Sequence, residues 1–158
     1  MSADLLENSV ELDGSSLISI PLAALLEYCD PTLDDPWGCG RIDPEDVLLQ
    51  VDYTRQRAKT IDYDDEVYRS YEYNIDRIAY FVKNGWESAG SDREPVTVDI
   101  GLAGYTPLHL LVDGNHRVAA AKIRGDETIT VEVIGDVTKA EAVFLRGVHP
   151  DDYSPLEA

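Results

Sequence analysis

The chain has 158 residues, of which 44% are hydrophobic, enough to bury one ordinary core. Thirty-one acidic residues against thirteen basic ones give a formal net charge of -18, which disfavours non-specific binding to nucleic-acid phosphates. There is no apolar run of bilayer-spanning length and no basic, then apolar, secretory signal. The two cysteines, Cys29 and Cys39, are typical of a reducing compartment, so we expect a cytoplasmic protein without a membrane partner.

The N-terminal part is predicted to alternate short elements with loops. Residues 1–15 are polar and acidic and are predicted to form a flexible lead-in. Residues 17–20 are a strand candidate, and Pro21 opens a brief helix to Tyr28, because proline suits a first helical turn. Residues 29–41 carry glycines, prolines and aspartates and are expected to form a long surface loop.

Two more helices follow in the prediction. Asp43 is a suitable N-cap for a short helix that begins at Pro44 and runs to about Val51. The clearest helix spans residues 65–86, since its apolar residues recur at spacings of three and four. The tyrosines gathered in this region are interpreted as core and rim packing, with a stacking platform for bases as the alternative.

Beyond residue 90 the apolar period changes to two. Residues 96–100 and 108–112 alternate on either side of a turn, which predicts a hairpin with one buried face. A helix is expected from Arg117 to about Arg124, followed by a strand over 128–134. A capping box that begins at Thr138 then opens a last helix to about Arg146. This order predicts a mixed α+β fold, with a mixed sheet and flanking helices, over residues 16–147, and a tail over 148–158.

The turn between the second hairpin strand and the next helix contains the residues best suited to binding a ligand. It reads Asp113-Gly114-Asn115-His116-Arg117 and is followed by three alanines. Gly114 permits a tight turn and close approach of a ligand, and Asn115 is a good cap residue. The helix N-terminus offers amide donors, and His116 and Arg117 add side-chain donors suited to phosphate oxygens. The pattern therefore predicts an anion site.

This stretch, with Gly125 and the strand 130–133, resembles the ParB/sulfiredoxin superfamily over about residues 75–145. Its turn is nearest to the Asp-Gly-His-His-Arg turn of the free serine kinase branch. The resemblance implies a pocket for a nucleoside di- or triphosphate (ATP, ADP or CTP) with Mg²⁺. The site residues that it implies or that the pattern suggests are Asp113, Gly114, Asn115, His116, Arg117 and Arg57.

The resemblance also suggests roles. Gly114, Asn115, His116 and Arg117 would hold phosphates, with a further contact from Arg55 or Arg57. Catalysis would fall to Asp113, His116 and Arg117, with Asp113 binding Mg²⁺ or taking a proton; Glu45 and Asp46 are alternative bases. Asn115 stands where sulfiredoxins carry their cysteine, which excludes that chemistry at this position. The short tail leaves no room for the DNA-reading region of partitioning proteins.

Three functions stay open from sequence. The leading one is a nucleotide-binding domain, acting as a phosphotransferase or nucleotide hydrolase. The alternative is a non-catalytic acidic module that binds a basic protein partner or mimics DNA, as a plasmid or phage inhibitor would. A weaker alternative is a ParB-like nuclease, which the net charge of -18 disfavours.

Overall fold

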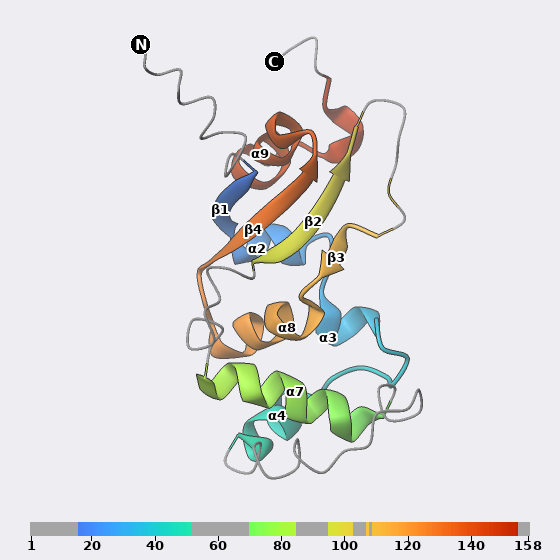
Figure 1. Ribbon diagram of the computed structural model, residues 1–158, viewed down its shortest axis with the longest axis vertical. Helices are drawn as coiled ribbons and strands as arrows, with labels where there is room; N and C mark the ends of the chain where they lie inside the picture. Colours follow the sequence, from blue (N-terminus) through green and yellow to red (C-terminus); the bar gives the residue numbers. More distant parts are fainter. Residues whose placement is uncertain (1–15, 52–69, 85–94, 103–106, 108, 155–158) are drawn as a thin grey trace. The chain divides into compact units, whose positions relative to one another are not determined.

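The computed structural model describes residues 16–51, 70–84, 95–102, 107 and 109–154 (Figure 1). The chain divides into two compact units. The sheet unit comprises Met1–Tyr28, Pro95–Asp113 and Glu127–Ala158. The helical unit comprises Cys29–Glu94 and Gly114–Asp126. The predicted mixed α+β class is confirmed, and each unit is considered by itself below.

The sheet unit holds a four-stranded mixed sheet in the order β1-β4-β2-β3. Its strands are β1 (Leu17–Pro21), β2 (Val96–Gly101), β3 (Leu111–Asp113) and β4 (Thr128–Gly135). β4 is antiparallel to β1 and parallel to β2. β2 and β3 pair antiparallel, with Val98 opposite Leu111, so the antiparallel pairing of the predicted hairpin is confirmed. The bounds predicted for the second strand, 108–112, are wrong, because β3 spans Leu111–Asp113, with Leu111 buried and Val112 52% exposed.

Alternation along β4 explains how this sheet buries one face. Ile129, Val131 and Val133 are buried, whereas the residues between them are exposed. The helices α2 (Leu22–Leu26) and α9 (Val137–Arg146) contact the sheet and contribute buried side chains, among them Leu25 and Phe144. Period-two hydrophobicity thus places one side of the strands in a core.

Two helix starts in this unit differ in detail from the prediction. Pro21 is extended and ends β1 before α2 begins, so the helix opens one residue later and closes at Leu26. The N-cap of α9 is Asp136, whose Oδ1 accepts a hydrogen bond from the Lys139 amide at 3.1 Å. The capping box predicted at Thr138 is therefore wrong, because the N-cap lies two residues earlier, at Asp136, and the helix starts at Val137.

The helical unit contains α3 (Pro31–Asp34), α4 (Pro44–Gln50), α7 (Tyr71–Asn84) and α8 (Asn115–Arg124). The predicted N-cap Asp43 is confirmed, since its side chain accepts from the Glu45 amide. The described part of the predicted 65–86 helix is α7, and residues 65–69, 85 and 86 lie outside the described residues. The core gathers residues of α4, α7 and α8, with the small side chains of Ala119 and Ala120 packed among them.

The surface loop predicted over residues 29–41 is wrong in part, because it contains α3. Pro31 and Thr32 are buried, and Asp30 caps the helix by accepting from the Thr32 amide at 3.1 Å. Lys122 of α8 holds the start of α3 in place, because its Nζ lies 2.7 Å from Asp30 Oδ2 and 2.8 Å from Thr32 Oγ1. Although burial alone would raise the pKa of Asp30, these hydrogen bonds outweigh it and the pKa is lowered.

Candidate functional site

The predicted turn begins where β3 ends. Asp113 is the last residue of that strand, and its side chain is exposed in the sheet unit. Gly114 follows with φ 106° and ψ 23°, a left-handed conformation that glycine adopts without the strain of a side chain. Gly114 is the N-cap of α8, and its backbone forms the tight turn predicted from the sequence.

Asn115 is the first residue of α8, which corrects two expectations. The cap position expected for Asn115 is held by Gly114, which has no side chain to offer the helix. The helix also begins two residues before the predicted Arg117. Asn115, His116 and Arg117 therefore form the first turn, where backbone amides have no partners within the helix.

His116 is held by Asn74 of α7. Its Nε2 lies 2.7 Å from Asn74 Oδ1, and both residues belong to the helical unit. The Asn74 amide nitrogen donates to the Ser70 carbonyl at 2.8 Å, so Oδ1 is the acceptor toward the ring. His116 is therefore the donor, with its proton on Nε2 and the lone pair on Nδ1.

Two aromatic rings enclose this imidazole. The Trp37 ring is stacked on it, with centroids 4.5 Å apart and planes 12° from parallel. Tyr73 meets it edge-on at 6.5 Å and 83°. Burial lowers the pKa of His116 to about 3, with further contributions from the positive charges of Arg77 and Arg117. The ring is consequently neutral near pH 7 and adds no positive charge to the turn.

Positive charge at the turn comes from arginine. Arg117 lies in the first turn of α8 and is only 9% exposed. Arg77 is half-buried on α7, where its guanidinium lies 5.7 Å from the centroid of Tyr80 and 5.1 Å from that of Phe81. Arg77 and Arg117 both lower the pKa of His116. The region around this histidine is therefore positively charged, although the chain has a net charge of -18.

Sequence reasoning missed Trp37, Tyr73, Asn74 and Arg77 as neighbours of the turn. Asn74 did carry a signal in the sequence, because it is a polar residue at helical spacing within an apolar stripe, three residues after Tyr71 and four before Ile78. The structure shows that Asn74 is fully buried in α7. A polar side chain in such a stripe indicates a specific hydrogen-bond partner. Trp37 lies between α3 and α4, where the sequence offers no periodic pattern.

The other site residues predicted from the sequence are Arg55, Arg57, Glu45 and Asp46. Arg55 and Arg57 are not among the described residues. Glu45 and Asp46 are in the first turn of α4, and Asp46 Oδ2 accepts from the Tyr71 hydroxyl at 2.7 Å. Across the described ranges, no three His, Cys, Asp or Glu side chains gather as a metal site would require.

Neither cysteine forms a disulfide. Burial raises the pKa of Cys29 to about 12, with Asp34 and Asp30 adding to the effect. Burial likewise raises the pKa of Cys39, whose Sγ lies 3.8 Å from Asn74 Nδ2. Both groups are therefore thiols near neutral pH, which makes them poor nucleophiles.

Comparisons with known proteins add no family. No protein-family model, curated protein or solved structure matches the chain. Within the part of the chain that the structure describes, no helix has the length and apolar character to cross a membrane. The resemblance of about residues 75–145 to the ParB/sulfiredoxin superfamily stays a prediction.

Proposed function

We propose that this cytoplasmic chain binds a nucleoside di- or triphosphate at Gly114–Arg117. The observation that carries the proposal is the left-handed Gly114 at the start of a ten-residue helix. The amides of the first turn have no helical acceptors, and the positive end of the helix dipole favours an anion there. A glycine cap lets phosphate oxygens approach the backbone closely.

The arginines support an anionic ligand over a neutral one. Arg117 would pair its guanidinium with phosphate oxygens, and Arg77 would add positive potential from α7. Both positive charges lower the pKa of His116, which is part of this turn. His116 itself would be a positioning residue, because its ring is neutral and its N–H is directed to Asn74.

Mg²⁺ is the cofactor that the resemblance implies. Asp113 is a suitable hard oxygen ligand, and one protein carboxylate is enough where the phosphates and water supply the rest of the shell. When bound, Mg²⁺ would neutralise phosphate charge. The donor set thus fits a metal carried by the nucleotide better than a metal held by the protein alone.

A reaction at this site would be phosphoryl transfer or nucleotide hydrolysis. A His116 pKa of about 3 makes the imidazole a weak base, so proton removal would fall to a carboxylate. Asp113, Glu45 and Asp46 stay the alternatives. Arg117 would stabilise the charge that develops on the transferred group.

The direct test is isothermal titration with ATP, ADP and CTP in the presence of Mg²⁺. We expect saturable binding by the wild type and a loss of about ten-fold or more in affinity for Arg117→Lys, which keeps the charge but lacks the forked donors. Arg146→Ala, an exposed arginine of α9, is a control because it removes a positive charge elsewhere. Absence of binding by the folded wild type would overturn the proposal.

A second candidate rests on the net charge of -18. The chain would act as an acidic module that binds a basic protein or mimics DNA. Capture of purified basic DNA-binding proteins at low and at high salt tests this function. A salt-sensitive complex together with no nucleotide binding would favour it over the nucleotide site. Incubation of plasmid DNA with Mg²⁺ or Mn²⁺ tests the nuclease alternative.

A further inference from the structure

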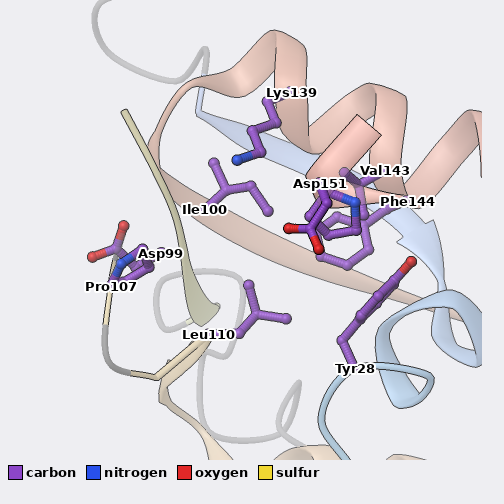
Figure 2. A pocket seen from close by; sticks show the side chains of 10 residues that line it. Tyr28, Asp99, Ile100, Pro107, Leu110, Lys139, Val143, Phe144 and Asp151 are labelled. Atoms are coloured by element: carbon purple, nitrogen blue, oxygen red, sulfur yellow. The ribbon is translucent and has the colours of Figure 1, made fainter. Parts of the chain in front are cut away.

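The sheet unit contains a pocket that shares no residue with the Gly114–Arg117 turn (Figure 2). It has a volume of about 330 Å³, near the lower end of the range for small-molecule sites. Its walls come from the end of β2, the residues before β3, α9, Tyr28 and the 3₁₀ turn η2 (Pro150–Asp152). A cavity of this size suits a small molecule rather than a segment of a partner protein.

Apolar side chains from separate segments of the chain face this pocket. Ile100 of β2 and Leu110, just before β3, lie on one side of it, and Phe144 of α9 and Tyr28 lie on the other (Figure 2). Val143 of α9 is also part of the lining. Because apolar surface gains free energy by leaving water, walls of this kind favour a ligand with an apolar body.

Two aromatic rings make one side of the pocket rigid. Phe144 is 2% exposed, and the Tyr28 ring meets it edge-on, with ring centroids 6.3 Å apart and the planes at 77°. The His149 ring also meets Tyr28 edge-on, at 6.2 Å and 70°, so the tyrosine is held by two rings. Edge-to-face contacts are favourable between aromatic groups. A third ring, carried by a ligand, would extend the same cluster.

The two carboxylates of the lining do not converge on one point. Asp99 lies across β2 from Asp151 (Figure 2), and its Oδ1 accepts a hydrogen bond from the Gly101 amide at 3.0 Å. The Asp151 side chain is 90% exposed, so its carboxylate stays in water. A cation that entered the pocket would therefore lose hydration without gaining a buried partner.

An anionic ligand is disfavoured as well. Lys139 of α9 is the one cationic side chain among the described lining residues, and it is half-buried. The same lining carries the two carboxylates, and the whole chain has a net charge of -18, so an anion meets a negative potential. The charges of this unit thus favour an uncharged ligand over either ion.

We infer that this pocket binds a small uncharged molecule that carries an aromatic ring. The ring would lie between Tyr28 and Phe144 on one side and Ile100 and Leu110 on the other. Its binding free energy would come from burial of apolar surface and from edge-to-face ring contacts. A hydroxyl or other neutral polar group of the ligand would stay at the mouth of the pocket, in water. The site is independent of the proposed nucleotide site, because it lies in the other unit.

The test compares three probes that share one ring and differ in charge: benzyl alcohol, benzylammonium and benzoate. Binding is followed by amide chemical shifts in ¹H–¹⁵N spectra of the full chain. We expect saturable shifts at Leu110, Val143 and their neighbours with benzyl alcohol. Both charged probes should bind at least about five-fold more weakly, because each loses hydration as the ring enters. 1-Propanol, which has the hydroxyl but no ring, should give no saturable shifts at the same concentrations.

Variants of the lining identify the groups responsible. Leu110→Trp should fill the pocket and weaken binding of benzyl alcohol by about ten-fold or more. Val112→Trp is the matched control, since it adds the same ring at a 52% exposed residue that does not line the pocket. Tyr28→Leu keeps an apolar side chain but removes a ring, and should weaken binding by about three-fold to five-fold. Asp151→Asn should change the affinity by less than about two-fold, because its carboxylate is in water.

The outcomes separate clearly. Preference for benzyl alcohol that is lost in Leu110→Trp and reduced in Tyr28→Leu, but kept in Val112→Trp, would support the inference. A charged probe that binds as tightly as the alcohol, shifts confined to residues away from the pocket, or no saturable binding by the folded wild type would overturn it. If Leu110→Trp does not fold, the probe series and Tyr28→Leu still decide the question. Nucleotide titration of the same samples reports separately on the other site.

Discussion

The imidazole of His116 is stacked on the indole of Trp37, with ring centroids 4.5 Å apart and the planes 12° from parallel. This contact joins the first turn of α8 to the segment between α3 and α4 within the helical unit. With the hydrogen bond to Asn74, it fixes the ring from its face and from its edge. The arrangement makes His116 a neutral, positioned residue, and the following two predictions depend on it.

The stability of the protein should fall in mild acid because of His116. Its pKa is about 3 in the folded protein and about 6.5 when exposed, so the unfolded chain binds more protons between these values. The contribution is fully present above pH 6.5 and is lost progressively as the pH falls toward 3. Urea unfolding at stepwise lower pH should show a decline on the order of a few kcal/mol.

His116→Gln separates this effect from the many carboxylates, because the variant should lose the part of the pH dependence that belongs to the ring. Proton NMR provides a second measurement. The ring signal that is missing in His116→Gln should not titrate in the wild type between pH 7 and pH 5. Titration with a midpoint near 6.5 would contradict the burial of the ring.

Removal of the Trp37 ring should loosen the same cluster. Trp37→Leu is expected to lower the free energy of unfolding by about 1–3 kcal/mol, since it removes a stacked ring and leaves space beside His116. The pKa of His116 should rise toward its ordinary value, because water would reach the imidazole. Leu33→Ala on α3 is a control with an expected effect within about 0.5 kcal/mol, because Leu33 is 49% exposed. An unchanged pKa in Trp37→Leu would show that the indole does not shield the ring.

Gly135 should not tolerate a methyl group. A Cβ at this position would lie 2.4 Å from the carbonyl oxygen of Gly101, and φ is 103°. Gly135→Ala should therefore destabilise the sheet unit by about 3 kcal/mol or more, through a backbone clash as well as strain. Gly147→Ala is the matched control, since its φ is 76° but no atom lies within 4 Å of the added carbon. It should cost only about 1 kcal/mol in thermal or urea unfolding; equal losses for the two variants would refute the clash.

The N-cap of α9 is Asp136 in the structure, whereas the sequence pattern predicted Thr138. Asp136→Ala should cost about 1 kcal/mol, because it removes the acceptor of the Lys139 amide. Thr138→Ala should have almost no effect, whereas a capping box at Thr138 would make it the costly substitution. Asp136→Asn keeps an acceptor and should recover most of the stability. Urea unfolding of the three variants decides between the two caps.

The sequence predicted correctly those strands and helix ends that are determined by residues close together in the chain. Alternation in β2 and β4 arises from burial of one face, and Gly125 and Gly147 follow their helices in left-handed conformations, as the sequence indicated. The N-cap of α9 was missed by two residues, because Asp136 and Thr138 both suit an N-cap and only the backbone decides between them.

Features that depend on distant partners could not be predicted. The start of α3 is held by Lys122, which is 92 residues from Asp30 in the chain. Burial of the ring, with the positive charges of Arg77 and Arg117, keeps His116 neutral, and the ring contacts Trp37 and Asn74, the latter 42 residues away. The turn could be located from its residue types, but the charge state of its histidine is set by side chains that no local spacing brings together.

The division into units has a consequence for how the protein can be cut and assembled. The backbone passes between the units after Tyr28, Glu94, Asp113 and Asp126, so neither unit is a continuous piece of chain. A fragment that ends at Asp113 would contain the apolar residues of α7 without the alanines of α8 that pack against them. During synthesis, the helical core can therefore close only after the hairpin strands have left the ribosome, and no single cleavage yields two self-sufficient halves.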